Sequence, residues 1–463
     1  MTTSTPLTTG RIVRFWAPLA ATWLMMAAEG PFVAALIARM DQPKLNLAAW
    51  GVAIAFAMIN EAPVIMMMSA ATALVRDRAS FGVLRRFSTA VNGGVTVIML
   101  VLLLPPVFRL VAGRLIGLPD DVVRLANLAT AILLPWPAAI GYRRFYQGIL
   151  IGQGLTRRVA YGTVVRLAGM TAVGLTVYLA TSLPGVCVGA LALSSGVVLE
   201  ASATRLWARR AVHAVRGREP RPETAPLTTR RVVRFYLPLA LTSLLAIGVH
   251  PLVTFLVARS RMSIESLALL PVVTGLVFVF RSGGVALQEV CIALLGDDRG
   301  GRRPLARFTA ILAAAGAGAL ALVAFTPAAH LWLEQVSGLK PDLANLALLP
   351  LALLVAMPAF EALLSYQRAL LVHAHRTPPI TWATGIEVSG IALVIAIGTI
   401  GCNLVGAVAA AIGLVVGRLA ATAFLYRILR AEEVPSCIPD GVESVHARGR
   451  TQGRRGDRHR PDG

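Results

Sequence analysis

The chain has 463 residues, of which 56% are hydrophobic and only 14% are charged, and its mean hydropathy is +0.70. A soluble protein of this length could not bury so much apolar surface, so the composition indicates a protein that lies in a lipid bilayer. The net charge of +21 does not indicate a nucleic-acid partner, because the positive residues lie in loops between apolar stretches and not on one soluble face.

Twelve stretches of the chain are long and apolar enough to cross a bilayer core, which takes about 20 residues of helix. We therefore predict an all-α polytopic membrane protein with twelve transmembrane helices. The first stretch is too long to be the apolar core of a cleavable signal. The predicted spans cover residues 12–38, 47–75, 88–112, 122–150, 159–181, 185–208, 231–258, 265–294, 306–332, 341–371, 379–400 and 402–428.

The first predicted span is written a second time, 220 residues later in the chain. LTTGRIVRFWAPLAATWL (7–24) corresponds to LTTRRVVRFYLPLALTSL (227–244), and 17 of the 33 positions from 7 to 39 are identical to those from 227 to 259. A duplicated half with an even number of spans keeps one orientation, so the two copies are related by an axis along the membrane normal. Such duplication is typical of secondary transporters.

The duplication divides the chain into four parts. We predict an N-terminal six-helix lobe at 1–210, a Pro-rich cytoplasmic linker at 211–230, a C-terminal six-helix lobe at 231–430 and a disordered basic cytoplasmic tail at 431–463.

The basic residues predict the orientation of these lobes. With both termini in the cytoplasm, 33 Lys and Arg residues fall in inner segments and 8 in outer loops, as the positive-inside rule requires. The 33 residues of the inner segments include Arg143, Arg144 and Arg368. We expect a monomeric, multi-pass protein of the bacterial inner membrane with an N-in/C-in topology.

Three motifs carry a family resemblance. RFWAPLA (14–20), its copy RFYLPLA (234–240) and YRRFYQGILIGQGLTR (142–157) resemble motifs of the multidrug/oligosaccharidyl-lipid/polysaccharide exporter (MOP) superfamily, which includes the multidrug and toxin extrusion (MATE) transporters. LPWPAAIGYRRFYQGIL (134–150) also resembles the ankylosis-type anion exporters of that superfamily. The resemblance covers residues 7–430 and implies two six-helix lobes around a V-shaped, MATE-like cavity with alternating access.

The number of spans and one acidic residue qualify that resemblance. Twelve spans suit the extrusion and ankylosis types better than the fourteen-span flippases for peptidoglycan precursors. Some extrusion proteins have an aspartate in the first helix, whereas this chain has Glu29 at a different distance from Pro18. The coupling chemistry of those proteins is therefore not transferred to Glu29.

Charged residues occur in the last two predicted spans of each lobe, where each costs about 2.5–3.5 kcal/mol on insertion scales. Arg166 aligns with Glu387, and Glu200 falls within one residue of Arg418, so each lobe holds one charge of either sign. We predict intralobe ion pairs Arg166–Glu200 and Glu387–Arg418 that neutralise buried charge. A direct role of these four residues in the transport site is left open.

Glu61 and Arg281 occupy equivalent positions of the repeat, near the middle of spans 2 and 8. Because these spans line the cavity in the superfamily that the chain resembles, we predict that the two side chains face each other across the cleft. A carboxylate at this depth can carry a proton, and a guanidinium can hold an anionic group through two hydrogen bonds. A static salt bridge between the lobes is the alternative.

Other titratable residues complete the candidate site. Glu29 precedes Gly30-Pro31, and His250 precedes Pro251, so we predict a proline break beside a titratable group in the first span of each lobe. Such a break is either a hinge or ion site, or a plain kink. The resemblance implies a coupling acid in helix 10, where Glu361 lies. The candidate substrate and ion site comprises Glu61, Arg281, Glu29, His250, Glu289 and Glu361.

Motifs for nucleotide or covalent chemistry are missing from the sequence. Neither lysine, Lys44 or Lys340, has a Walker A context, and no HExxH, nucleophile elbow or CxxC pair occurs. We predict no enzymatic activity, no ATP hydrolysis, no metal site and no cofactor, with H+ or Na+ as the coupling ion.

The sequence thus predicts a cation-coupled secondary exporter of small organic solutes or drugs that works by alternating access. A flippase for a lipid-linked saccharide, an ankylosis-type organic anion exporter and a transport-dead membrane scaffold are the alternatives. The charge of the cargo is left open, because both acidic and basic residues lie within the spans.

Overall fold

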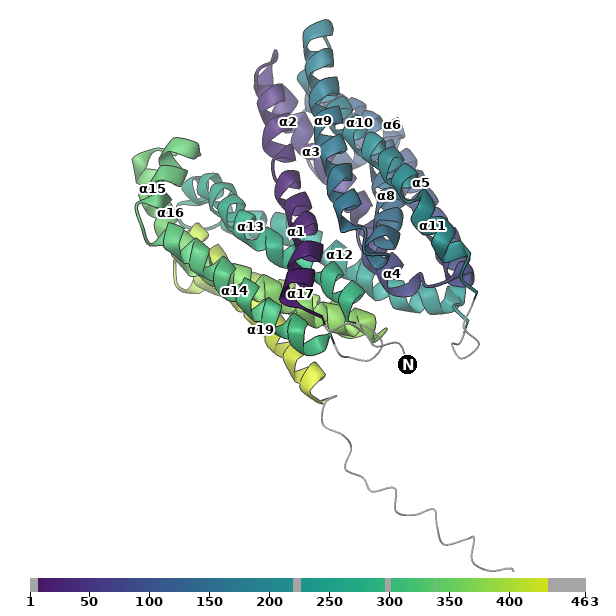
Figure 1. Ribbon diagram of the computed structural model, residues 1–463. Helices are drawn as coiled ribbons and strands as arrows, with labels where there is room; N and C mark the ends of the chain where they lie inside the picture. Colours follow the sequence, from purple (N-terminus) through teal and green to yellow (C-terminus); the bar gives the residue numbers. More distant parts are fainter. Residues whose placement is uncertain (1–6, 220–225, 296–300, 338, 432–463) are drawn as a thin grey trace, which may run out of the picture.

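The computed structural model describes residues 7–219, 226–295, 301–337 and 339–431, and the regular structure in these ranges is helical. Twelve of the helical segments are long and apolar enough to cross a membrane. They form two lobes that meet at one end of the molecule and diverge at the other, as the coiled ribbons of Figure 1 show. The predicted fold class, an all-α protein with twelve spans in two six-helix repeats, is confirmed.

Six spans build each lobe. In the N-terminal lobe they are α1 (Thr9–Met26) with α2 (Glu29–Ala38), α3 (Pro43–Glu61) with η1 (Ala62–Val64) and α4 (Met67–Leu74), α5 (Arg78–Leu103), α7 (Asp120–Ile132) with α8 (Pro135–Gly152), α9 (Thr156–Ala180) and α10 (Gly185–Trp207). In the C-terminal lobe they are α12 (Thr229–Val257), α13 (Ser263–Leu294), α14 (Arg302–Ala324), α16 (Pro341–Leu353) with η4 (Leu354–Ala356) and α17 (Met357–His373), α18 (Pro378–Ala396) with η5 (Ile397–Gly401), and α19 (Gly406–Ala431). Short elements connect them: α6 (Pro105–Phe108), η2 (Arg109–Leu115), α11 (Arg209–Arg216), α15 (Ala328–His330) and η3 (Leu331–Val336).

The third and ninth spans differ most from their predicted positions, because each lies earlier in the chain than 88–112 or 306–332. Local chemistry explains the shift of α5. Asp77 accepts the backbone N–H of Ser80 at 2.8 Å while the Ser80 hydroxyl accepts the backbone N–H of Asp77 at 3.0 Å, a capping box that starts the helix ten residues before position 88. Pro105 and Pro106 follow its end and cannot continue its hydrogen bonding.

The lobes repeat each other in local detail. Gln42 and Met262 both have left-handed backbone conformations, with φ of 49° and 52°, directly before the second span of their lobe. Asn46 then caps α10 by accepting the backbone N–H of Val186 at 3.0 Å, and Ser266 accepts that of Ala407, in α19, at the same distance. Equivalent positions therefore have the same backbone conformation and make the same helix-capping hydrogen bonds in the two lobes.

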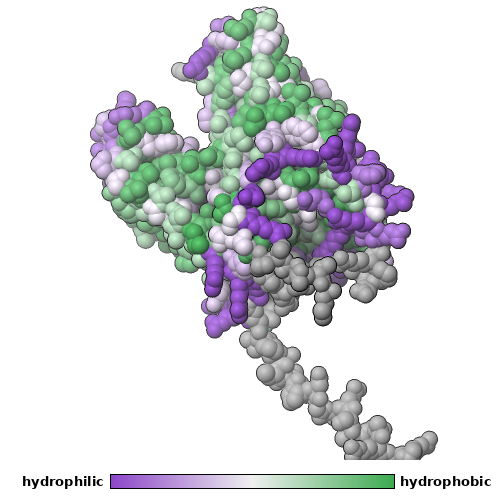
Figure 2. Space-filling model, viewed as in Figure 1, coloured by the Kyte–Doolittle hydropathy of each residue, from purple (hydrophilic) through white to green (hydrophobic). Residues whose placement is uncertain are grey.

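Three apolar cores explain the V shape. One contains residues of both lobes, among them Leu19 and Met67 from the N-terminal lobe and Phe235 and Leu287 from the C-terminal lobe. The other two lie each within a single lobe. We call the end of the molecule where α1 begins and α19 ends the joined end, and the opposite end the open end (Figure 1). Figure 2 shows the hollow between the lobes at the open end and the gathering of hydrophilic side chains around the joined end.

Part of the predicted linker belongs to the N-terminal lobe. The predicted boundary at residue 210 falls inside α11, which buries Val212 and Val215 and packs against α5. The backbone carbonyl of Arg218 also accepts the N–H of Arg78 at 3.2 Å. The middle of the linker and the predicted tail beyond Ala431 lie outside the described residues.

Candidate functional site

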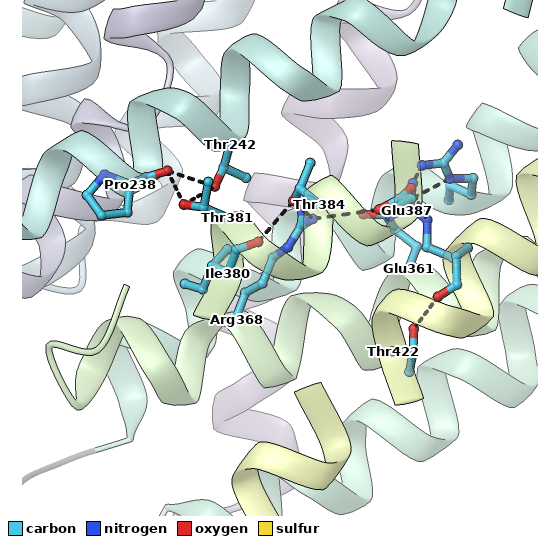
Figure 3. A network of polar contacts seen from close by, with 11 residues as sticks. Pro238, Thr242, Glu361, Arg368, Ile380, Thr381, Thr384, Glu387 and Thr422 are labelled. Carbon is cyan, nitrogen blue, oxygen red and sulfur yellow. Dashed lines mark hydrogen bonds and ion pairs between the residues drawn. The ribbon is translucent and has the colours of Figure 1, made fainter. Parts of the chain in front are cut away.

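Five charged side chains form one alternating chain in the interior of the C-terminal lobe (Figure 3). Arg281 on α13 donates two hydrogen bonds to Glu361 on α17, one of them from Nε at 3.1 Å. Arg418 on α19 lies between the two acids, with Nη1 3.3 Å from Glu361 Oε2 and Nε 3.0 Å from Glu387 Oε1. Arg368 on α17 ends the chain, with Nη2 4.0 Å from Glu387 Oε2. The order is therefore Arg281, Glu361, Arg418, Glu387 and Arg368.

Threonines connect this chain to α12. Arg368 donates to the Thr384 hydroxyl at 3.1 Å, and one helical turn earlier Thr381 donates to the backbone carbonyl of Pro238 at 2.6 Å (Figure 3). Thr242 donates to the same carbonyl at 2.8 Å. Such hydroxyl bonds satisfy backbone groups near a proline in a membrane-spanning helix, and the bond from Thr381 holds α18 against α12.

The alternating chain lines a cavity of about 630 Å³ within the C-terminal lobe. His250 on α12 lies in its wall and is exposed. The remaining wall is mostly apolar and comes from α12, α13, α17 and α19. The cavity thus combines an extended apolar surface with a group of fixed charges, the usual composition of a site for an organic ligand.

The N-terminal lobe holds a second charged group, which is packed and closed. Arg166 on α9 donates to Glu29 and lies 3.7 Å from Glu200 on α10. Arg143 on α8 donates to Glu200, which also accepts hydrogen bonds from Gln147 at 3.2 Å and Thr163 at 3.4 Å. Glu200 is completely buried. The predicted ion pairs Arg166–Glu200 and Glu387–Arg418 are both present, at 3.7 Å and 3.0 Å. Arg166 and Glu200 each have a different hydrogen-bonded partner in addition.

The first span is broken only in the N-terminal lobe. Ala27 and Ala28 interrupt it, and Glu29 is the first residue of α2. The carboxylate therefore lies at the positive end of the α2 dipole as well as against Arg166. In the C-terminal lobe, α12 runs without interruption from Thr229 to Val257 and includes Pro251, so the predicted break beside His250 is wrong.

Glu61 and Arg281 do not face each other. Arg281 points to Glu361 of its own lobe. Glu61 is the last residue of α3, is 8% exposed, and makes no hydrogen bond or ion pair within the described chain. The positive charge that acts most strongly on it is that of Arg144 on α8. The predicted contact across the cleft is wrong, because Arg281 is paired with an acid of its own lobe and Glu61 makes no ion pair among the described residues.

Sequence reasoning misplaced three arginines. Arg143, Arg144 and Arg368 were assigned to inner segments, but they are buried or half-buried within α8 and α17. Their positions inside the predicted spans 122–150 and 341–371 were the available signal. The bias of basic residues toward the joined end survives without them.

Glu289 lies at the joined end, between the lobes. It accepts a hydrogen bond from Ser69 on α4, and Gln288 donates to the same serine at 3.1 Å. Ser69 and Glu289 are equivalent positions of the repeat, 220 residues apart.

Two further hydrogen bonds across the joined end are also related by the repeat. Trp16 donates to the carbonyl of Gly283 at 2.8 Å, and Tyr236 donates to that of Pro63 at 2.6 Å. The donors are equivalent to each other, and so are the acceptors. The lobes are therefore joined around a pseudo-twofold axis.

Among the described residues, no group of three or more His, Cys, Asp or Glu side chains is placed to hold a metal ion. The charged groups of both lobes instead pair acids with arginines.

These features define a multi-pass membrane architecture, in which two pseudosymmetric lobes diverge from one joined end around buried charges. Solved structures identify it further as the fold of the MATE transporters. A eukaryotic MATE transporter, AtDTX14, is 14% identical with a TM-score of 0.73, and the alignment covers 91% of this chain and 95% of that one. A mutant of the Vibrio cholerae MATE transporter VcmN is 16% identical with a TM-score of 0.74, covering 92% and 97%. A MOP superfamily transporter from Pyrococcus furiosus is 16% identical with a TM-score of 0.70, covering 91% and 95%.

No protein-family model and no curated protein matches the sequence. The MATE-like fold implied by the resemblance of the sequence motifs is confirmed by the solved structures. At identities of 14% and 16% these structures show the fold alone.

Proposed function

We propose that the protein is a secondary active exporter that moves a small organic solute across the bacterial inner membrane by alternating access, coupled to H+ or Na+. The observation that carries the proposal is the arrangement of cores. Among the described residues the lobes share apolar packing at the joined end alone, whereas the hollow between them opens at the other end. The MATE transporters with the same fold support this reading.

The positive-inside bias supports a cytoplasmic joined end, and with that orientation the proposal assigns the structure to an outward-facing state. To reach an inward-facing state, the lobes must separate the shared core and break the hydrogen bonds of Trp16, Tyr236 and Glu289 across the joined end. The hydrogen bonds are arranged about one axis, as a rocking motion of two rigid lobes requires.

Glu61 is the acid that we assign to the coupling ion. Glu29, Glu200, Glu361 and Glu387 are each neutralised by an arginine of their own lobe. Glu61 has no ion-pair or hydrogen-bond partner among the described residues. A carboxylate without a fixed partner can exchange a proton or bind a cation without breaking an existing salt bridge.

Transport by the purified protein in liposomes tests the proposal. A pH or sodium gradient is imposed, and the flux of a panel of organic cations, organic anions and lipid precursors is measured. We expect gradient-dependent flux of at least one class, its loss in Glu61→Gln and its retention in the matched variant Glu334→Gln, which changes a half-exposed acid of η3. Absence of flux for every class, or normal flux in Glu61→Gln, would contradict the proposal or the assignment of Glu61, respectively.

A further inference from the structure

We propose that the cavity of the C-terminal lobe binds an amphipathic organic anion. Its acidic group would be held by Arg281 and the neighbouring arginines of the alternating chain, and its apolar body would lie against α12, α13 and α19. That this anion is the cargo rests on the proposed transport function, whereas its binding does not.

The first argument is the charge of the cavity. Three arginines face only two glutamates, so the alternating chain is neutral only when one more negative charge is present. The accessible end of the chain is positive, because the Arg281 side chain is 23% exposed and that of Glu361 is 8% exposed. In addition, the Nε group of Arg368 is buried and donates no hydrogen bond. The donors thus exceed what the two acids accept.

The second argument is the contrast with the other lobe. There, Arg143, Arg144 and Arg166 are balanced by Glu29, Glu61 and Glu200. By the repeat spacing, the position equivalent to Glu29 is Val249, which lines the cavity and carries no charge. The missing acid is therefore at the wall of the cavity, where a ligand can supply the charge instead.

The third argument is the size and lining of the cavity. A volume of about 630 Å³ is far larger than an inorganic ion needs. Val249, Val253, Leu267, Leu270 and Leu414 give it an apolar wall. The combination fits a ligand with an acidic group at one end and a hydrophobic body.

A second hollow is also lined by positively charged side chains. It lies between α1, α9 and α13 at the joined end and has a volume of about 720 Å³, and none of the described residues in its lining is acidic. Its arginines are Arg11, Arg14, Arg157, Arg158 and Arg218. Grouped positive charge raises the local concentration of anions, so this hollow would gather an anionic solute on the side that we propose to be cytoplasmic.

Two dyes with a shared xanthene ring system and opposite charge test the inference. Fluorescein is anionic and rhodamine 123 is cationic, and fluorescence anisotropy reports their binding to the protein in phosphatidylcholine nanodiscs. Arg281→Gln removes the accessible positive charge. Glu361→Gln removes the acid that competes with an anion for Arg281. Arg124→Gln, an exposed residue of α7, is the matched control for loss of one positive charge, and thermal unfolding confirms that each variant is folded.

We expect fluorescein to bind and rhodamine 123 not to bind. Arg281→Gln should weaken fluorescein binding about tenfold or more, since a charged hydrogen bond is lost. Glu361→Gln should strengthen it, and Arg124→Gln should leave it unchanged. A purely structural Arg281–Glu361 pair would instead weaken binding in both variants. That result, or preferential binding of rhodamine 123, would overturn the inference.

Phosphatidylglycerol added to the nanodiscs distinguishes the source of the anion. Competition with fluorescein indicates a lipid headgroup in the cavity, and lack of competition indicates a free solute. Either outcome supports an anion site. Fluorescein that binds without any gradient-driven flux in liposomes would refute the proposed transport function and leave the anion site standing.

Discussion

The closure of the joined end depends on two hydrogen bonds that the repeat makes equivalent, those of Trp16 and Tyr236. Replacing each donor by phenylalanine removes the bond and keeps an aromatic ring in place. A neutral hydrogen bond contributes about 0.5–1.5 kcal/mol net. The double variant Trp16→Phe/Tyr236→Phe should therefore shift the equilibrium toward the inward-facing state by about 1–3 kcal/mol, or roughly 5- to 150-fold.

Spin-label distances across the joined end measure this shift. Labels are placed at Arg85 on α5 and Arg303 on α14, both exposed near that end, in a background without native cysteines. We expect a second, longer distance to gain population in the double variant. Each single variant should give about half of the free-energy change, because the two bonds lie on different helices and share no residue.

Tyr161→Phe is the control, because Tyr161 is exposed and its ring contacts Trp207 of its own lobe. It should leave the distances unchanged. Unchanged distances in the double variant as well would refute the reasoning, since the joined end would then be held by the shared apolar core alone.

Three further predictions concern stability. Gly148→Ala should lower the free energy of unfolding by about 1–3 kcal/mol through overpacking, because a Cβ at Gly148 would lie 2.5 Å from the Met68 carbonyl oxygen. The Cβ of Gly94→Ala meets no atom within 4 Å, so this control should leave thermal unfolding unchanged. Glu200→Gln should destabilise by about 3–5 kcal/mol, and adding Arg143→Gln should restore part of the loss in thermal unfolding. His375 lies between two spans, and burial and nearby positive charges lower its pKa to about 4. Because the unfolded chain then binds the proton first, stability should fall as the pH drops from about 6.5 to 4, and His375→Asn should flatten that part of the profile.

The fold was predictable from sequence to the extent that it depends on hydropathy and on duplication. Hydropathy and repeat similarity are both summed over many residues, so errors of a few residues at the ends of a span did not change the number of spans. The third and ninth spans were misplaced because arginines at their inner ends resemble loop residues. Only the capping box at Asp77 and Ser80 shows where α5 begins, and it is a local signal that hydropathy does not contain.

The site was predictable only in part, because partner choice depends on how helices rotate. Arg166, Glu200, Glu387 and Arg418 do lie in charged groups of their own lobes. Yet Arg166 donates its hydrogen bond to Glu29, because the break after Met26 turns α2 toward α9 and α10. No rule based on residue spacing predicts a break of that kind. The excess of arginines in the cavity also depends on how each helix is rotated about its own axis, which the sequence does not show.

The failure of the Glu61–Arg281 prediction shows where the pseudo-twofold axis runs. Residues related by such an axis touch only where they lie on it, and Ser69 and Glu289 do so at the joined end. Glu61 and Arg281 each lie eight residues from this pair, which is about 12 Å of helix. They lie toward the open end, where the lobes have diverged, so equivalence in sequence there means separation in space. A charge at that depth has no partner across the cleft in this state. Arg281 is paired with Glu361 of its own lobe, where one positive charge is left for a ligand, whereas Glu61 has no ion-pair partner among the described residues and can exchange a proton.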